Sequence, residues 1–192
     1  ETAATETTKD SVIVIPSSQE SKVKVEETET GTKVTVDQPA KKVSYTVEDG
    51  GTVSSTGSGI SKALFTFTGA GSVEITNNAV KDSKVLGSDS NDGVAIGVGV
   101  TQTAAKDVKI NTGEGSDTVT VSTRVAKKIK INLGEDTDAD NIRIDTDIEK
   151  IKDLVIMNFG KEDTFTFGNK TYTADQLKNQ PFSPNIEFKF SN

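Results

Sequence analysis

The sequence contains no histidine, cysteine or tryptophan, and aromatic residues make up only 5% of its 192 residues. The missing histidine and cysteine exclude Ser-His-Asp and Cys-His catalysis, zinc sites built from these residues, thiol redox chemistry and disulfide bonds. Hydrophobic residues reach only 32%, which is low for a globular enzyme. We therefore expect thin layers of apolar side chains instead of a wide core.

Charge and hydropathy limit the class of partner. Acidic residues outnumber basic residues by 29 to 22, which gives a net charge of −7. A surface of this sign repels phosphate backbones and argues against nucleic acid as a partner. No run approaches the ~20 apolar residues of a membrane span. The sequence opens without a basic-then-apolar leader, as expected of a chain whose leader has been removed or of an excised domain.

Short stretches in which every second residue is apolar recur about every ten residues. Examples are residues 33–36, 118–121 and 164–167, and Gly, Asn and Asp separate such stretches. This pattern predicts an all-β chain. Residues 1–10 are rich in Thr and Glu without periodicity and are predicted to form a flexible linker. A single helical turn is predicted at residues 173–177, shortly before Pro181.

An internal repeat indicates how the strands are arranged. Residues 108–113, 129–134 and 155–160 share the order apolar, any, apolar, Asn, any, Gly, and an acidic turn and a further strand follow each. A unit of about 21 residues with two short strands cannot bury its apolar face alone, and stacked copies can. We predict a β-solenoid of the β-roll or parallel β-helix type; the alternative is an antiparallel β-sandwich. Residues 11–60 would form N-terminal strands, as a cap or a small β-module, and residues 61–192 the repeats with a C-terminal cap.

The acidic turns between the repeats are candidate calcium sites. Glycine lets a turn adopt positive φ and leaves carbonyl oxygens uncovered, and Ca²⁺ takes six to eight oxygen ligands from carbonyls and carboxylates. The alternative is that Asp simply stabilises these turns by bonding to the local backbone. The candidate ligands are Gly113, Gly115, Asp117, Asp136, Asp138, Asp140 and Asp163.

Residues 113–119 read G-x-G-x-D-x-apolar and resemble the nonapeptide repeat of the RTX (haemolysin-type) calcium-binding β-roll, with Thr112 where the family has its first Gly. Residues 158–165 resemble the segment that closes RTX arrays. The likeness covers about residues 87–177, but RTX repeats follow one another every nine residues, whereas this period is about 21. The resemblance implies a divergent, calcium-binding β-roll in a secreted or cell-surface bacterial protein.

These observations favour a non-catalytic structural or adhesive module, such as a segment of an adhesin or an S-layer, stabilised by calcium. One alternative is a module that binds a host protein or a glycan without metal. Another is a polysaccharide-active β-helix enzyme, against which the scarcity of sugar-stacking aromatics counts, with Tyr45 and Tyr172 the only tyrosines.

Five lysines recur at equivalent corners of the repeat. We predict that they keep a solvated edge from pairing with other strands; the alternative is a ladder that recognises an acidic glycan. These lysines are Lys41, Lys42, Lys106, Lys127 and Lys128.

Overall fold

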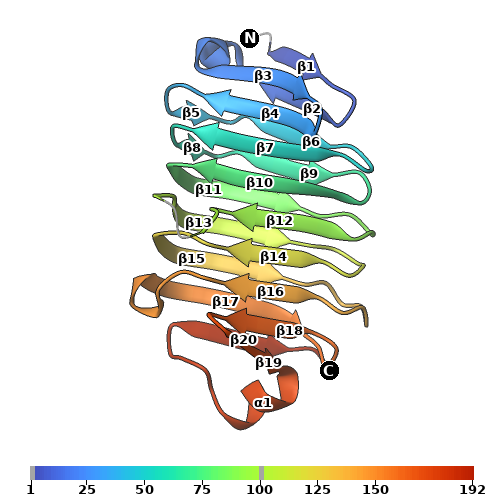
Figure 1. The fold of residues 1–192 in the computed structure, drawn as a ribbon, viewed down its shortest axis with the longest axis vertical. Coiled ribbons are helices and arrows are strands. Elements are labelled where there is room, and N and C mark those ends of the chain that lie inside the picture. Colours follow the sequence, from blue (N-terminus) through green and yellow to red (C-terminus); the bar gives the residue numbers. More distant parts are fainter. Residues whose placement is uncertain (1–2, 100–101) are drawn as a thin grey trace.

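The chain folds into a β-solenoid of about six turns with a spacing of about 21 residues. The structure is a computed structural model that describes residues 3–99 and 102–192. Two sheets face each other, and their strands stack along the long axis of the molecule (Figure 1). The strands of successive turns pair in parallel. The predicted solenoid is therefore confirmed, and the antiparallel sandwich is wrong.

Each turn contributes one strand to a nine-stranded sheet and then one to an eleven-stranded sheet. The nine-stranded sheet contains, in spatial order, β19 (Lys170–Thr173), β18 (Thr164–Phe167), β16 (Asn141–Ile144), β14 (Thr118–Val121), β12 (Asp92–Ile96), β10 (Gly71–Asn77), β7 (Thr52–Gly57), β4 (Gly31–Val36) and β3 (Val23–Thr28). The eleven-stranded sheet contains β1 (Ala4–Thr7), β2 (Ser11–Ile15), β6 (Ser44–Val47), β9 (Leu64–Phe67), β11 (Ala79–Leu86), β13 (Ala104–Asn111), β15 (Val125–Asn132), β17 (Ile151–Phe159) and β20 (Ile186–Phe190), with the short strands β5 (Ala40–Lys41) and β8 (Ile60–Ser61) beside this path.

Helical structure is confined to short segments. The 3₁₀ turns η1 (Ser17–Lys22) and η2 (Ile148–Lys150) lie between strands, and α1 (Ala174–Asn179) confirms the predicted helical turn. Thr173 and Gln176 form a capping box at the start of α1, which satisfies two backbone N–H groups that the helix leaves unpaired. Among the described residues, no helix has the length and apolarity needed to cross a membrane.

The core is a narrow layer of stacked side chains between the two sheets. Alternation along each strand points Val, Ile and Phe inward, and in-register pairing stacks them from turn to turn. Each buried Val or Ile contributes roughly 1.5–3 kcal/mol. One inward column of the nine-stranded sheet, at most 2% exposed, consists of Val53, Val73, Val94, Val119, Ile142 and Phe165.

Both ends of the solenoid are covered. At the C-terminal end β19 turns back antiparallel on β18. Most of the aromatic side chains gather there, because the last turn has no following turn to cover its apolar edge. They are Phe159, Phe165, Phe167, Tyr172, Phe182, Phe188 and Phe190.

The N-terminal end differs from the sequence-based prediction. Residues 4–7, predicted as part of a linker, form β1, which pairs antiparallel with β2, and Ala4 packs against the core. Pairing with β1 satisfies backbone groups at the edge of β2. β4 already pairs in parallel with β7, so regular stacking begins at Gly31 instead of at residue 61.

Every turn bends once within the eleven-stranded sheet at a residue with positive φ. At this corner the bend residue and the residue before it both point outward, whereas the next residue is buried. The lysine-bearing corner of the repeat is thus confirmed. The bend residues, with φ between 49° and 59°, are Lys42, Lys62, Asp82, Asp107, Lys128 and Asp153.

Candidate functional site

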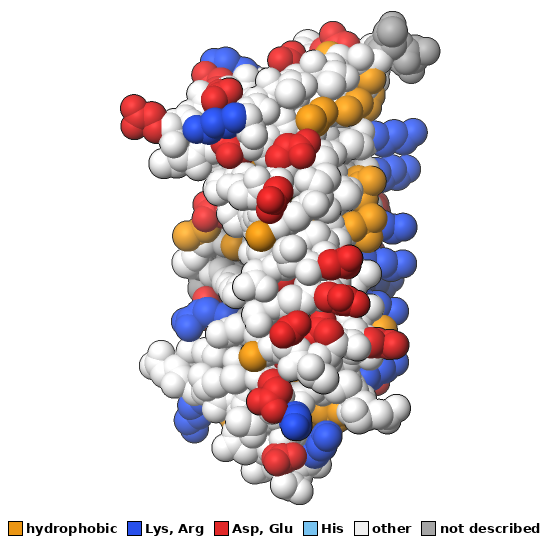
Figure 2. All heavy atoms as spheres, turned by 90° about the vertical axis from the view of Figure 1, so that its right-hand side faces the viewer, with side chains coloured by type: hydrophobic (Ala, Val, Ile, Leu, Met, Phe, Trp, Pro, Cys, Tyr) orange, Lys and Arg blue, Asp and Glu red, His pale blue; other side chains and the backbone are white. Residues whose placement is uncertain are grey.

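The turns that lead from the eleven-stranded to the nine-stranded sheet stack along one edge of the solenoid, which carries many acidic side chains (Figure 2). The Asn-x-Gly corners of the repeat meet here. Asn111 pairs with Asn132, and Asn158 Nδ2 donates to Asn132 Oδ1 at 2.7 Å. The stacking of these corners, on which the sequence-based prediction of the fold rested, is confirmed.

Glycines allow the turns to stack closely. Gly113 and Gly134 have φ of 96° and 88°. A Cβ atom on Gly134 would lie 1.9 Å from the carbonyl oxygen of Gly113, and one on Gly113 would lie 1.9 Å from that of Ser88. Gly115, with φ of 99°, lies against Ser90 and Asn91 of the preceding turn. The turn at residues 113–117 therefore contacts both the preceding turn at residues 88–91 and the following turn at Gly134 through bare backbone.

A column of aspartates runs through this edge, one residue in each of four successive turns. Asp92, Asp117, Asp140 and Asp163 stand at the entry to β12, β14, β16 and β18, and each is only 1–3% exposed. We call these four residues the aspartate ladder. Its members lie at the same place in each turn because the strands they precede are paired in register.

Hydrogen bonds link the aspartate ladder from one turn to the next. The backbone N–H of Asp92 donates to Oδ1 of Asp117 at 2.7 Å, that of Asp117 to Oδ1 of Asp140 at 2.8 Å, and that of Asp140 to Oδ1 of Asp163 at 2.9 Å. At the last turn, Asp163 Oδ2 accepts from Gly160 N–H at 2.7 Å. The carboxylates of Asp117, Asp140 and Asp163 thus each satisfy a buried backbone donor of the preceding turn.

Burial perturbs the acidity of the aspartate ladder. Burial, together with repulsion from Asp92 and Asp136, raises the pKa of Asp117 to about 7. Burial and the nearby carboxylates of Asp163 and Asp117 raise the pKa of Asp140 to about 8. The pKa values of Asp92 and Asp163 are raised as well, with burial the main cause. A buried carboxylate favours its neutral form unless a donor or a cation offsets the charge.

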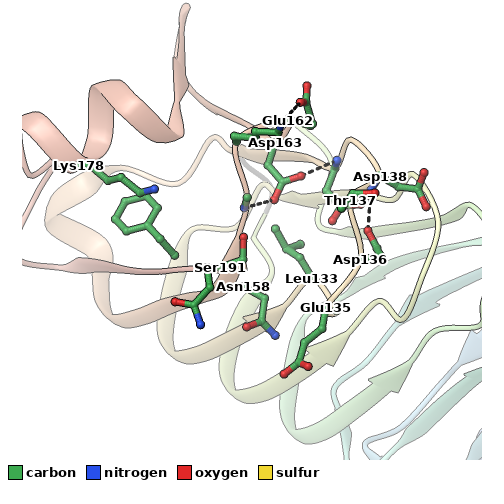
Figure 3. A pocket seen from close by; sticks show the side chains of 16 residues that line it. Leu133, Glu135, Asp136, Thr137, Asp138, Asn158, Glu162, Asp163, Lys178 and Ser191 are labelled. Carbon is green, nitrogen blue, oxygen red and sulfur yellow. Dashed lines mark hydrogen bonds and ion pairs between the residues drawn. The ribbon is translucent and has the colours of Figure 1, made fainter.

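The last two acidic turns line a groove of about 550 Å³ together with Lys178 and the C-terminal residues 190–192. Figure 3 shows Asp136, Asp138, Glu162 and Asp163 close together, with Lys178 apart from them. Asp136 Oδ1 accepts from the backbone N–H of Asp138 at 2.8 Å, so this turn is fixed by one of its own carboxylates. Lys161 forms an ion pair with Glu162 at 3.4 Å. The groove is therefore predominantly, but not entirely, negative.

Four of the candidate calcium ligands line this groove: Asp136, Asp138, Asp140 and Asp163. Asp117 lies one turn away and is joined to Asp140 by the ladder. The sequence therefore identified acidic residues that line the same groove. The grounds for choosing them were the resemblance to RTX repeats and the preference of calcium for the oxygen ligands of acidic turns. Asp92, the first member of the ladder, was not among the candidates. Like Asp117, it stands at the start of a strand in which every second residue is apolar, and this position is the signal that could have found it.

Two observations bear on whether this edge suits a metal ion. Oδ1 of Asp92 and Oδ2 of Asp117 and Asp136 are buried without a hydrogen-bond partner, and such oxygens suit a hard cation. On the other hand, within residues 3–99 and 102–192 no three His, Cys, Asp or Glu side chains are grouped so that they could hold a metal ion. As they stand, the ladder carboxylates act as acceptors for backbone N–H groups.

Comparison with protein-family models, with curated proteins and with solved structures finds no match. The β-solenoid is established by the structure itself, and nothing in the fold distinguishes an RTX β-roll from other solenoids.

Proposed function

We propose that this chain is a rigid, non-catalytic spacer or adhesive module of a secreted or cell-surface bacterial protein. The observation that carries the proposal is the unbroken stack of paired strands. β3 and β19 lie at opposite ends of the nine-stranded sheet, and a strand spacing of about 4.8 Å separates them by about 38 Å. The solenoid therefore holds whatever is attached to its two ends at a fixed distance (Figure 1).

The extracellular location rests on sequence features. The RTX-like turn at residues 113–119, the acidic composition and the lack of cysteine agree with a bacterial surface protein. Calcium enters the proposal as a stabilising ion at the acidic edge, where Asp117 Oδ2 and Asp136 Oδ2 have no donor. No catalytic role is assigned to the groove, since Asp140 and Asp163 already accept hydrogen bonds from backbone N–H groups.

Labelling of intact cells tests the location. An antibody raised against the folded chain should bind intact cells of the source organism, and cells that lack the gene should remain unlabelled. A cytoplasmic protein serves as the control for leakage, because antibody against it should bind only after lysis. Labelling that requires lysis would contradict a surface role.

A further inference from the structure

Lysines form straight rows on the outer face of the eleven-stranded sheet. Lys81, Lys106, Lys127 and Lys152 occupy the same register position in four successive strands. A second row, three residues further along the strands, contains Lys84, Lys109 and Lys130. Because parallel neighbours lie about 4.8 Å apart, each row places positive charges at that interval along the solenoid axis.

The two rows belong to a larger basic surface that we call the lysine ridge. It also includes the positive-φ bend residues, which we call the corner column, and Lys41, which continues the first row toward the N-terminal end. The ridge contains eleven lysines and three acidic residues, the bend residues Asp82, Asp107 and Asp153. All of these lysines are exposed, and Figure 2 shows lysine side chains projecting in a column along one side of the molecule. The lysines are Lys41, Lys42, Lys62, Lys81, Lys84, Lys106, Lys109, Lys127, Lys128, Lys130 and Lys152.

The ridge thus gathers half of the 22 basic residues of a chain whose net charge is −7. The prediction that the corner lysines protect a sheet edge is wrong for Lys106, Lys127 and Lys128. These residues lie in β13 and β15, and each of these strands is paired with a neighbouring strand on both sides.

The positive charge of the ridge is hardly neutralised by the protein itself. Across the described residues, the only ion pair that involves a ridge lysine joins Lys128 Nζ to Asp107 Oδ1 at 3.8 Å. Like charges at paired positions of neighbouring strands repel and destabilise a sheet. A row of four lysines such as Lys81 to Lys152 therefore lowers the stability of the free protein, and an external row of negative charges would restore it.

We propose that the lysine ridge binds a linear anionic polysaccharide that lies along the solenoid axis. A chain with one carboxylate or sulfate per repeat unit, and a repeat comparable to the strand spacing of about 4.8 Å, can pair with successive lysines of one row. Asp82, Asp107 and Asp153 lie between the rows and can accept hydrogen bonds from sugar hydroxyl groups. Glycan binding at the ridge does not require the chain to act as a spacer. A result that contradicts one of these two proposals therefore leaves the other standing.

The chemistry of the ridge favours a polysaccharide over a nucleic acid. Arg143, which could clamp phosphate with two parallel hydrogen bonds, lies in β16 of the other sheet, and Arg124 precedes β15. From β6 to β17, the outward positions beside the lysine rows carry no aromatic side chain; they hold Ser44, Thr46, Leu64, Thr66, Leu86, Asn111, Asn132, Val155 and Met157. Single-stranded nucleic acids are held by aromatic stacking, which these residues cannot provide, and a duplex backbone winds away from a straight row.

Isothermal titration calorimetry of the full chain tests the proposal. The probes are a linear polyuronate and a linear sulfated glycan, with dextran as the uncharged control and single- and double-stranded DNA of matched charge as competitors. Both anionic glycans, or the one whose charge spacing fits, should bind at low salt (about 20 mM) and weaken steeply as salt is added. Dextran should not bind, and bound glycan should raise the melting temperature.

Matched variants locate the binding surface. Lys106→Gln/Lys109→Gln/Lys127→Gln should weaken glycan binding by about tenfold or more, because three contacts are lost. Lys9→Gln/Lys33→Gln/Lys170→Gln removes the same charge elsewhere and should change affinity by no more than about twofold. Lys106→Arg/Lys109→Arg/Lys127→Arg keeps the charge and should retain binding, which shows that the exchanged positions tolerate substitution.

Four results would overturn the proposal. The first is that neither anionic glycan binds at low salt. The second is equal weakening in the ridge and control Gln variants, which would make the effect one of net charge. The third is tighter binding of DNA than of the glycans at matched charge. The fourth is self-association at low salt that the ridge variant abolishes, which would mean that the ridge docks on the acidic edge of a second copy.

Discussion

The backbone N–H of Asp117 donates a hydrogen bond of 2.8 Å to Oδ1 of Asp140, so a side chain of one turn holds the backbone of the turn before it. Both residues are almost fully buried. A carboxylate at this position is therefore a structural acceptor, whatever else it binds.

The acceptor role of Asp140 predicts a difference between two substitutions. Asp140→Ala leaves the buried N–H of Asp117 without an acceptor and should lower the free energy of unfolding by about 1–3 kcal/mol. Asp140→Asn keeps a carbonyl oxygen there and should cost less than about 1 kcal/mol. Urea unfolding measures both, and Asp138→Ala, an exposed residue of the same turn, should stay within about 0.5 kcal/mol of wild type. Equal losses in the Ala and Asn variants of Asp140 would contradict the acceptor role.

The raised pKa values of the aspartate ladder predict that stability falls as pH rises. Asp117 and Asp140 have pKa values of about 7 and about 8 in the folded chain, against 3.8 ordinarily. Between pH 4 and pH 8 the folded state therefore keeps protons that the unfolded state has lost. The stability that this provides is fully present below pH 4 and is lost as pH rises through 7 and 8.

The measurement is urea unfolding at pH 5 and pH 8, where we expect the chain to be more stable at pH 5 by on the order of 1–3 kcal/mol. Asp117→Asn/Asp140→Asn should flatten this dependence. A chain that becomes more stable between pH 5 and pH 8 would show that the aspartate ladder is charged in the folded state, as a bound cation would make it.

Calcium binding at the acidic edge predicts a shift in melting temperature. Calcium in excess should raise the midpoint, by an amount equivalent to about 2.7 kcal/mol at 100 times the dissociation constant, and chelator should reverse it. Asp136→Asn/Asp138→Asn should remove the shift, whereas Asp82→Asn/Asp153→Asn, which removes the same charge from the corner column, should keep it. An unchanged melting temperature of the wild type would contradict calcium binding at the acidic edge.

Close stacking of the turns predicts unequal costs for two glycine substitutions. Gly134 and Gly168 both have positive φ, but a Cβ atom would meet the Gly113 carbonyl oxygen at Gly134 and nothing within 4 Å at Gly168. Gly168→Ala should cost about 1 kcal/mol from backbone strain alone, and Gly134→Ala about 2 kcal/mol or more beyond that. Similar costs at the two sites would mean that the turns are further apart.

The sequence was sufficient to predict the repeat and the edge where the acidic turns meet. The Asn-x-Gly corners and the alternation of Val and Ile follow from local rules, so the solenoid and the grouping of Asp136, Asp138, Asp140 and Asp163 could be predicted. The hydrogen bonds from one aspartate to the next could not, because they depend on which carboxylate oxygen faces the neighbouring turn.

The sequence predicted only part of the lysine ridge. Lys106 and Lys127 were recognised as equivalent, but Lys81 and Lys152 were not, since insertions between turns vary the spacing in the sequence while the register in the sheet stays constant. Net charge concealed the ridge as well, because the ridge carries only three of the 29 acidic residues. The fold therefore gathers positive charges on the ridge and negative charges on the acidic edge, a separation that the net charge of the whole sequence does not reveal.

We predict that the solenoid is a rigid body of fixed length. Because the chain has no cysteine, Lys24→Cys/Thr171→Cys allows one spin label on β3 and one on β19, the first and last strands of the nine-stranded sheet. Double electron–electron resonance should give a single narrow distance distribution centred at about 40 Å. A broad distribution, or a centre far below that distance, would contradict a rigid spacer built from stacked turns.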